Sequence, residues 1–298
     1  MKLYAPKYYK QFSCIADKCS HSCCIGWEID VDSDALKRYK KLKHYYAKNI
    51  LESIEDGHFI LGENERCPHL DKNGLCNIIS HLGKDYLCNI CSEHPRYYND
   101  TPRGKEVGIG MACEEACRLI LSCDDCFETE EISETKDEDN SSLFDTLPQR
   151  NYIFEILKSD TPHDEKLEKI YQEFSVSPDI LTDEEWQEEI ISQIEYLNES
   201  HKELFMCYSS RLDTPEQYKD VLKRALAYLI YRHCAECFDE NDFISSLGFC
   251  LFCERLLCSI LKKEMPKTEK EIIRLCVTFS EEIEYSEDNT DTIKFEFE

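Results

Sequence analysis

The segment Cys14-Ile-Ala-Asp-Lys-Cys19-Ser-His-Ser-Cys23-Cys24 places four thiols within eleven residues. The cysteines are separated by four, three and no residues, so an ordinary helix or strand cannot turn all of them into one core. A loop that folds its thiols around a metal fits better, because four convergent thiolates are a complete ligand set for zinc, Cu(I) or an iron–sulfur cluster. The pattern therefore predicts a thiolate metal site, with disulfides and plain buried thiols as the alternatives.

A second group of cysteines follows between residues 67 and 91. Cys67 and Cys76 flank Asn73-Gly74, a strong tight-turn signal, so a turn there brings the two thiols near one another. Cys88 and Cys91 have the two-residue spacing that lets neighbouring thiolates bind one ion. The predicted metal ligands, of which any four form a set, are Cys14, Cys19, Cys23, Cys24, Cys67, Cys76, Cys88 and Cys91.

The remaining thiols are weaker candidates. Cys113 and Cys117, four residues apart on a predicted helical face, are second-choice metal ligands. Because free cysteine also behaves as a small hydrophobe, packing in a core is the alternative role for both thiols. His94 precedes a proline in a loop, which is more typical of a hydrogen-bonding partner than of a ligand. Packing is the predicted role of two pairs in apolar helical stretches, Cys234 with Cys237 and Cys250 with Cys253.

Composition limits the class of function. The 298 residues carry a formal net charge of -26, which repels nucleic acid and anionic membranes alike, so no partner of either kind is expected. No apolar run approaches the roughly 20 residues that span a bilayer. The first residues, Met1–Pro6, lack the pattern of a signal peptide, and we expect a reducing, cytoplasmic location in which thiols stay available as ligands.

The predicted fold is mainly α. A cysteine-rich, loop-dominated N-terminal metal-binding region with a few short β-strands covers residues 1–127, because twelve of the nineteen cysteines lie at or before Cys126. Residues 128–142 are rich in acids and predict a linker or mobile loop. An α-helical domain follows at 143–298, with apolar residues at three- and four-residue spacing.

Short elements are predicted along both parts. Alternating apolar and acidic residues predict a strand at 25–31, and apolar residues another at 59–61. Helices are predicted at 33–43, 45–54, 77–82, 150–158, 165–174, 183–197, 214–233, 242–261 and 269–284, and the tail from residue 286 is predicted to fray.

Residues 106–121 predict a strand, a glycine-bearing turn and a helix. Backbone N–H groups at Gly108 and Gly110 can approach an anionic ligand group at such a junction. Two glycines alone are weak evidence, since the β-α-β context of a dinucleotide fold is missing, and close packing is the alternative explanation.

Several of these motifs together resemble the flagellin lysine-N-methylase family. They are Phe12-Ser-Cys14 through Cys24-Ile-Gly-Trp27, Cys67-Pro-His-Leu70, Gly74-Leu-Cys76, Cys88-Asn-Ile-Cys91 with His94-Pro-Arg96, Gly108-Ile-Gly110 with Cys113-Glu-Glu-Ala116, and Tyr231-Arg-His233. The resemblance implies transfer of a methyl group from S-adenosylmethionine to lysine ε-amines of flagellin, with a [4Fe–4S] cluster, or alternatively zinc, on the N-terminal cysteines.

The resemblance also suggests roles for individual residues. Candidates for guiding or deprotonating the lysine are Glu28, Glu114, Glu115 and Tyr97, and candidates for binding S-adenosylmethionine are Gly108, Gly110 and Arg96. Cys19 and Cys23 begin the spacing of radical enzymes, but Gly26 stands where the third thiol belongs, which favours polar methyl transfer. A non-enzymatic zinc- or iron-binding module and a thiol redox sensor are the competing hypotheses.

Overall fold

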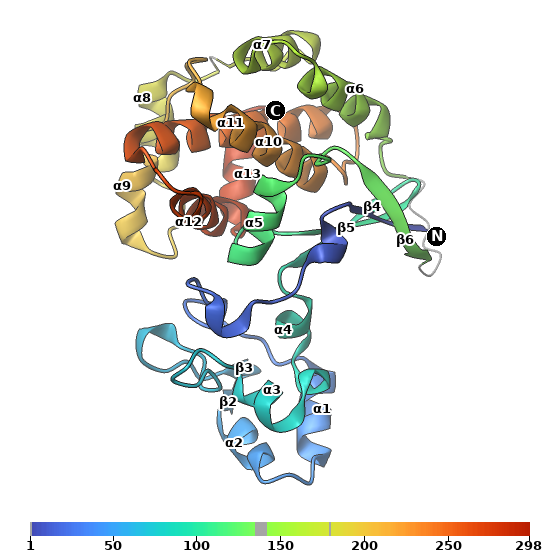
Figure 1. Ribbon diagram of the computed structural model, residues 1–298, viewed down its shortest axis with the longest axis vertical. Coiled ribbons are helices and arrows are strands. Elements are labelled where there is room, and N and C mark those ends of the chain that lie inside the picture. Colours follow the sequence, from blue (N-terminus) through green and yellow to red (C-terminus); the bar gives the residue numbers. More distant parts are fainter. Residues whose placement is uncertain (1, 135–141, 179) are drawn as a thin grey trace. The chain divides into compact units, whose positions relative to one another are not determined.

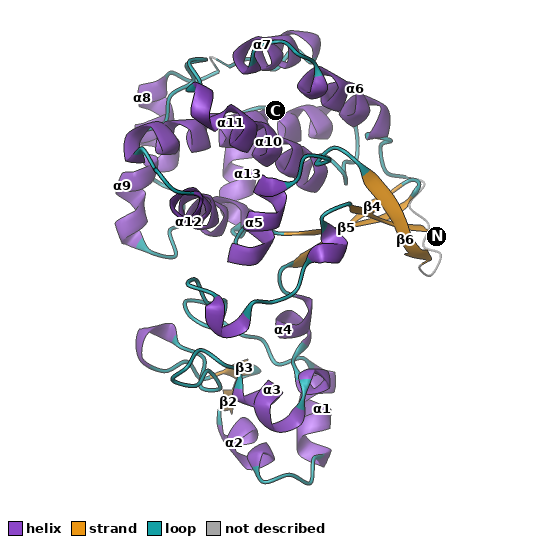
Figure 2. Cartoon of the chain, viewed as in Figure 1, coloured by secondary structure: helices purple, strands orange, loops and turns teal. Residues whose placement is uncertain are grey.

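The computed structural model describes residues 2–134, 142–178 and 180–298. Helices dominate and strands are few and short, which confirms the mainly α class (Figures 1 and 2). The chain forms two compact units, a helical unit of residues 1–12, 97–112 and 116–298, and a cysteine unit of residues 13–96 and 113–115. These limits differ from the predicted ones because the first strand pairs with strands about one hundred residues later, as its register shows.

A four-stranded sheet in the order β4-β5-β1-β6 holds the N-terminus in the helical unit (Figure 2). Strand β1 (Lys2–Pro6) pairs in parallel with β5 (Gly104–Ile109) and antiparallel with β6 (Thr129–Glu134), and β4 (Arg96–Thr101) lies at the other edge. A Cβ atom on Gly104 would lie 2.2 Å from the Lys2 carbonyl oxygen, so this pairing requires glycine.

The prediction of a linker at 128–142 is wrong for its first half, because residues 129–134 form β6. Lysines near the N-terminus balance its acids: Lys2 Nζ lies 2.7 Å from Glu131 Oε2, and Lys10 Nζ lies 3.1 Å from Glu130 Oε1. Pairing with β1 therefore orders a stretch that its charge alone would leave unfolded. The rest of the predicted linker, residues 135–141, lies outside the described residues.

The helices of this unit pack around one long apolar helix, α11 (Figure 1). Their bounds are α5 Glu114–Ser122, α6 Leu147–Lys158, α7 His163–Glu173, α8 Asp183–Glu185, α9 Lys202–Phe205, α10 Lys219–His233, α11 Glu240–Glu264, α12 Glu269–Phe279 and α13 Glu287–Phe295. Among the described residues, α11 is the one helix with the length and hydropathy of a membrane span, and 94% of that stretch is buried inside the protein.

Two predictions for the helical unit differ from the structure. The helix predicted at 183–197 is shorter: Thr182 caps α8 with a capping box, and a π-helical turn, Trp186–Ile191, follows. The predicted fraying tail is wrong, because α13 is ordered there. Ile293 is fully buried, and the Asn289 amide donates to the Glu282 carbonyl oxygen at 2.7 Å, so packing holds a segment that its acidic composition disfavours.

Buried ion pairs also hold the helical unit. Glu106 on β5 is fully buried between Arg150 Nη2 at 2.9 Å and Arg103 Nη2 at 2.5 Å. Glu254 on α11 contacts Arg255 Nε at 2.5 Å and His163 Nε2 at 2.8 Å. Each carboxylate thus has the charged partners that burial requires.

The cysteine unit contains four short helices and a two-stranded ribbon: α1 Ser33–Lys41, α2 Tyr46–Glu52, α3 Asn77–Leu82, α4 Asn89–Glu93, β2 Ile54–Glu55 and β3 His58–Phe59. Asp32 caps α1 through Ala35 N at 2.8 Å and also accepts from Asn89 N at 2.8 Å, which ties α4 to α1. The strand predicted at 25–31 is wrong. Only isolated bridges form there, at Ile25 and Asp30, and Gly26 has a φ of +82° that breaks an extended run.

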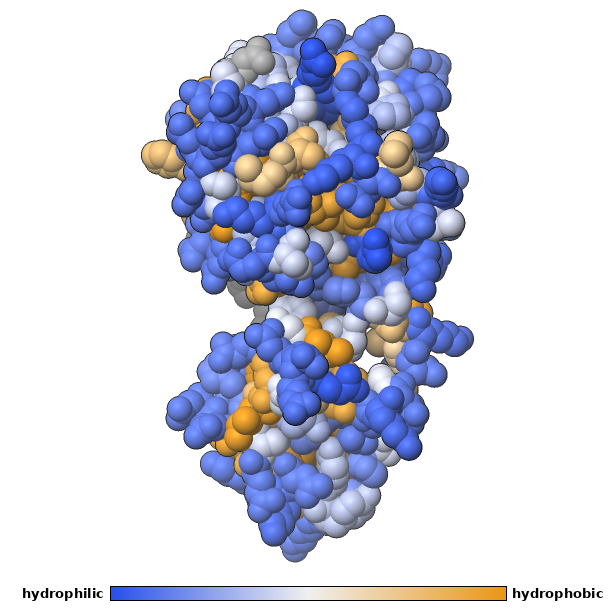
Figure 3. All heavy atoms as spheres, turned by 90° about the vertical axis from the view of Figure 1, so that its left-hand side faces the viewer, coloured by the Kyte–Doolittle hydropathy of each residue, from blue (hydrophilic) through white to orange (hydrophobic). Residues whose placement is uncertain are grey.

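Hydrophilic residues cover most of the face shown in Figure 3, as a chain of net charge -26 requires. Hydrophobic residues reach the surface there in smaller areas, on both units.

Candidate metal centre

All nineteen cysteines are free thiols, so none of the disulfides considered from the sequence forms. Nine of them belong to the cysteine unit and interact electrostatically in two groups joined by the adjacent residues Cys23 and Cys24. The loop group is Cys14, Cys19, Cys23 and Cys113. The core group is Cys24, Cys67, Cys76, Cys88 and Cys91.

Backbone contacts bring the first thiols of the core group together. Cys67 N donates to the Cys24 carbonyl oxygen at 2.8 Å. The predicted turn at Asn73-Gly74 is confirmed: Asp71 Oδ1 accepts from Asn73 N and from Leu75 N, each at 2.8 Å, and Leu70 and Cys76 form a bridge. Residues on either side of the turn therefore lie next to each other, as a two-thiol knuckle requires.

Cys88 and Cys91 form the other side of the core group, at α4. A hydrogen bond from the Cys91 thiol lowers the pKa of Cys88, and the Tyr39 hydroxyl, 3.4 Å from Cys88 Sγ, adds to this. The same interaction raises the pKa of Cys91. The pair thus favours one thiolate and one thiol, and the thiolate is the form that binds metals.

The joining pair behaves in the same way. A hydrogen bond from the Cys23 thiol lowers the pKa of Cys24 to about 7, and the Arg66 guanidinium also favours the thiolate. Burial instead raises the pKa of Cys67 to about 12. The surroundings therefore favour the thiolate at Cys24 and the neutral thiol at Cys67.

Glu114 organises the loop group. Its Oε2 atom accepts from Ser20 N at 2.6 Å, Ser20 Oγ at 2.7 Å, His21 N at 3.1 Å and Cys19 Sγ at 3.6 Å. Burial alone would raise the pKa of Glu114, but these hydrogen bonds outweigh it and hold the pKa below its usual value. The predicted role of Glu114 as a base for lysine is thus disfavoured, because its carboxylate already fixes a loop.

The donor set fits a soft metal in its chemistry. As the side chains lie, no three His, Cys, Asp or Glu residues in the described part of the chain are close enough to hold one metal ion. Closing a site therefore requires thiol side chains to turn toward a common centre, as happens where metal binding and folding are coupled. The thiols need to approach one another less closely around a four-iron cluster than around a zinc ion with Zn–S bonds of about 2.3 Å, because the cluster is larger than a single ion.

Two histidines lie in the same unit. His69 accepts or donates hydrogen bonds at both ring nitrogens, to Tyr46 and Ser53 at 2.9 Å each, which leaves no lone pair for a metal. The Nε2 atom of His94 is buried without a hydrogen-bond partner among the described residues, and burial lowers the pKa of His94 to about 4. His94 is thus a neutral imidazole.

The other predicted site residues of the cysteine unit lie at its surface. The Glu28 side chain is 73% exposed, and its Oε1 lies 3.4 Å from His58 Nδ1, which Asp30 also contacts at 2.7 Å. Glu115 is half-buried beside Glu114. Arg96 Nη1 donates to the Ser92 and Glu93 carbonyl oxygens at 3.4 Å, at the end of α4.

Tyr97, Gly108 and Gly110 belong to the helical unit. The Tyr97 ring lies under the guanidinium of Arg232, 4.9 Å from its centroid, and burial raises the pKa of Tyr97 well above its usual value. A Cβ atom on Gly108 would lie 2.2 Å from Tyr97 Oη, and one on Gly110 would lie 2.3 Å from Tyr285 Oη. These contacts favour the packing explanation of the glycines, since tyrosines fill the space beside them.

Thiols of the helical unit pack in its core. Cys117 Sγ lies 3.8 Å from the Ile273 carbonyl oxygen, and Cys113 precedes α5, so the two do not share a helical face as predicted. Cys234 Sγ and Cys250 Sγ are 3.7 Å apart and fully buried. Cys237 and Cys253 are also fully buried, as packing thiols are.

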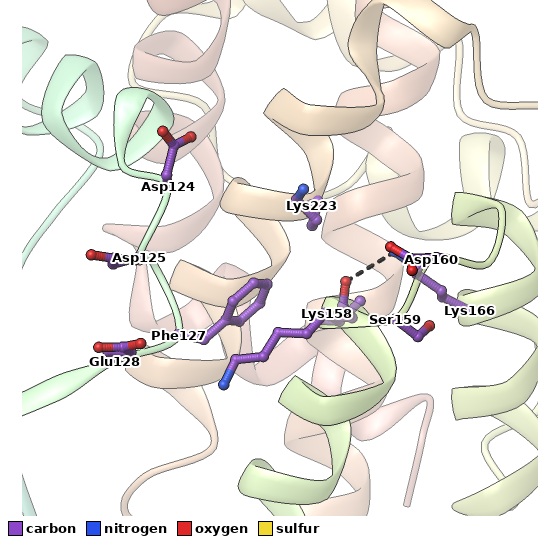
Figure 4. A pocket seen from close by; sticks show the side chains of 10 residues that line it. Asp124, Asp125, Phe127, Glu128, Lys158, Ser159, Asp160, Lys166 and Lys223 are labelled. Atoms are coloured by element: carbon purple, nitrogen blue, oxygen red, sulfur yellow. Dashed lines mark hydrogen bonds between the residues drawn. The ribbon is translucent and has the colours of Figure 1, made fainter.

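A cavity of about 390 Å³ opens in the helical unit between α6, α7 and the segment after α5 (Figure 4). Three lysines and four acids line it together with Phe127, Leu157 and Ser159. Lys166 Nζ donates to the Leu157 carbonyl oxygen at 3.0 Å, and burial lowers the pKa of Lys166.

Fold and site define a mainly helical protein with a thiol-rich candidate metal centre. Neither a family model nor a solved structure matches the chain. It is 27% identical over 164 residues to the flagellar biosynthetic protein FliU of Salmonella muenchen, a match that covers 51% of this chain and 94% of that protein. It is 29% identical over 140 residues to the lysine-N-methylases of Salmonella typhimurium and Salmonella choleraesuis, over 42% of this chain and 34% of each relative.

These matches confirm the resemblance seen in the motifs. The chain resembles lysine-N-methylases, and it spans about a third of the length of the two methylases. From the sequence, Cys113 was only a second-choice metal ligand, and its link through Glu114 to the first cysteines was not predicted. The signal that could have made Cys113 a first-choice candidate is the Cys113-Glu114 pair in the motif that carries the resemblance.

Proposed function

We propose that the protein transfers a methyl group from S-adenosylmethionine to lysine ε-amines of flagellin, with a [4Fe–4S] cluster on the core group. The gathering of five thiols in the core of the cysteine unit, in a relative of lysine-N-methylases, carries the proposal. A reducing, cytoplasmic location follows for a protein that keeps its thiols free.

The core group suits such a cluster in number and surroundings. Cys24, Cys67, Cys76, Cys88 and Cys91 are packed against the apolar core of their unit, where water is scarce and thiolates bind iron well. Five thiols exceed the four that a cluster needs. A cluster bound by four of these thiolates would be a structural staple, whereas a cluster bound by three would leave one iron able to bind S-adenosylmethionine.

The transfer itself needs a neutral lysine amine. The lysine ammonium first gives its proton to solvent water. Its nitrogen lone pair then forms the new C–N bond as the C–S bond of the sulfonium breaks, and sulfur keeps the electron pair as a neutral thioether. Gly26 in place of a third thiol favours this polar reaction over a radical one. Holding the methyl group in line with the amine supplies much of the acceleration.

The contacts of the candidate acids show which of them can meet the substrate lysine. Glu114 is engaged by the loop, whereas Glu28 is exposed and stands with Asp30 beside His58. A lysine ammonium is attracted to such a carboxylate pair before it loses its proton. We therefore assign to Glu28 the guiding role among the acids of the cysteine unit.

The test uses the full chain, purified without oxygen, with methyl-labelled S-adenosylmethionine and flagellin from the same organism. Methyl-lysine should appear, and Cys88→Ser should abolish it together with iron and sulfide. Cys207→Ser is the matched control, because Cys207 is a partly buried thiol of the helical unit. Intact cluster without any methyl transfer contradicts the proposal.

A metal-binding module without enzymatic activity is the second candidate, favoured by the thiols alone. It predicts bound metal, metal exchange with small thiols and no heat of S-adenosylmethionine binding by calorimetry. Measurable binding of S-adenosylmethionine would rule out this candidate.

A further inference from the structure

We propose that the cavity between α6, α7 and the segment after α5 binds a small organic monocarboxylate, with the ammonium of Lys166 as its charged partner. This inference goes beyond the proposed function, because all the residues that line the cavity belong to the helical unit and none is a cysteine. Three observations carry it: a buried ammonium, neighbouring charges that already have partners, and an aromatic wall.

Lys166 brings a buried ammonium to the cavity, since it belongs to the lining and is only 8% exposed. The partner that it contacts is neutral, because Nζ donates to the Leu157 carbonyl oxygen at 3.0 Å. Burial and Lys223 lower its pKa, and Asp160 and Asp220 offset this only in part. Within the described residues the ammonium thus lacks an ion pair, and two of its three N–H donors remain for a ligand. A buried charge needs an opposite charge, so an anion fits here.

Three of the four acids in the lining pair with cations outside it. Lys7 Nζ lies 3.3 Å from Asp125 Oδ2 and also pairs with Glu128. Arg224 Nη2 lies 2.6 Å from Asp124 Oδ1. In Figure 4 the side chains of Asp125 and Glu128 point to the side of their segment that faces away from the lysines of the cavity. These three carboxylates are 50–90% exposed, so water screens them and they do not neutralise the buried ammonium.

The other two lysines of the lining already have ionic partners. Lys158 Nζ lies 3.3 Å from Glu155 Oε1, and Lys223 Nζ lies 2.9 Å from Asp220 Oδ1. One ammonium without an ion pair therefore matches one negative charge. This count favours a carboxylate over a phosphate group, which carries up to two negative charges at neutral pH.

Phe127 gives the cavity an aromatic wall. Its ring packs against the ring of Phe154, with 5.5 Å between the centroids, and in Figure 4 it points toward the lysines. The volume of about 390 Å³ lies within the range of small-molecule sites. An aromatic face beside an ammonium suits an acid with a flat apolar body, whose ring packs on Phe127 while its carboxylate meets Lys166.

The experiment measures binding of benzoate to the full-length protein by ligand-detected NMR, beside benzamide, its neutral isostere, and inorganic phosphate. Benzoate should bind more tightly than either. Lys166→Met removes the charge and keeps the length of the side chain, and we expect it to weaken benzoate binding by about 10–100-fold. Lys169→Met is the matched control, because Lys169 is an exposed lysine of the same helix that lies over the Tyr152 ring, and it should leave binding unchanged. Equal binding of benzamide, tighter binding of phosphate, or equal losses in the two variants overturns the inference.

A second measurement uses the unsubstituted chain and so covers a Lys166→Met chain that fails to fold. Saturating benzoate should slow the acetylation of Lys166 by acetic anhydride and leave the rate at Lys169 unchanged, as read by mass spectrometry of the peptides. An unchanged rate at Lys166 would count against the site. Benzoate binding by a chain that transfers no methyl group would contradict the proposed function and leave this inference in place.

Discussion

The two units use the same residue for opposite purposes. Nine cysteines of the cysteine unit lie on turns and at helix ends, near one another, whereas the ten of the helical unit lie mostly buried in or beside its helices. Burial raises the pKa of Cys250 and Cys253 well above its usual value, so they stay neutral and pack as small apolar groups. A neighbouring thiol instead lowers the pKa of Cys24 and Cys88.

Cysteine spacing alone therefore does not separate a ligand from a core residue. Cys88 with Cys91 and Cys250 with Cys253 share the same two-residue spacing. The first pair begins a five-residue helix beside a tyrosine hydroxyl, and the second lies inside a 25-residue apolar helix. The secondary structure around the pair determines whether both thiols can face a common centre.

Removal of metal should produce the largest difference in folding between the two units. If thiolate sites hold the cysteine unit together, a chelator that strips the metal should unfold residues 13–96, because structural zinc alone contributes on the order of 10 kcal/mol. The helical unit should keep its fold. Limited proteolysis with mass spectrometry locates the cuts, and cleavage spread evenly over both units would show that the comparison is mistaken.

The helical unit should depend instead on its buried ion pairs. Glu106→Ala leaves Arg150, of which 2% is exposed, without its buried partner, so we expect a loss of about 3–5 kcal/mol in the free energy of unfolding. Glu155→Ala removes a carboxylate that is 72% exposed and pairs with Lys158, and should cost less than about 1 kcal/mol. Urea unfolding measures both, and equal losses would refute the distinction.

Local signals predicted much of this fold. The helices predicted to begin at residues 33 and 183 do begin there, capped by Asp32 and Thr182, and the turn at Asn73-Gly74 forms, because each depends on residues within a few positions. Strand β6 and helix α13 escaped prediction, since residues far apart in the sequence hold them: Lys2 pairs with Glu131 of β6 across the sheet, and Asn289 of α13 accepts a hydrogen bond from Glu195 N. Placing Cys113 beside Cys19 likewise required contacts between residues that lie far apart in the sequence.

Acid should destabilise the helical unit through Glu254. Burial alone would raise the pKa of this carboxyl, but Arg255 and His163 hold it at about 2, below the value of roughly 4.3 in an unfolded chain. A depressed pKa stabilises the fold above pH ~4.3, and this contribution, about 3 kcal/mol, is lost as the pH falls toward 2. Trp27→Phe leaves Trp186 as the only tryptophan, so its fluorescence reports this unit alone.

The matched variant for this pH series is Glu254→Gln in the same background. It removes the titrating group, so the free energy of unfolding should start lower and depend less on pH below 4. The same acid dependence with glutamine at this position would assign the effect to other carboxylates, such as Glu106.

The smallest expected effect tests the glycines of the matched motif. Gly110→Ala places a Cβ atom 2.3 Å from Tyr285 Oη and 3.1 Å from Arg232 Nη1, so packing predicts a loss of about 1–3 kcal/mol in stability. Gly62→Ala, whose Cβ would meet its nearest neighbour at 3.5 Å, is the control and should change stability by less than about 0.5 kcal/mol. A role in binding S-adenosylmethionine predicts the opposite result for Gly110→Ala. Unfolding would then be unchanged and the binding heat lost, because the glycine would face a ligand and not the two side chains that now fill its space.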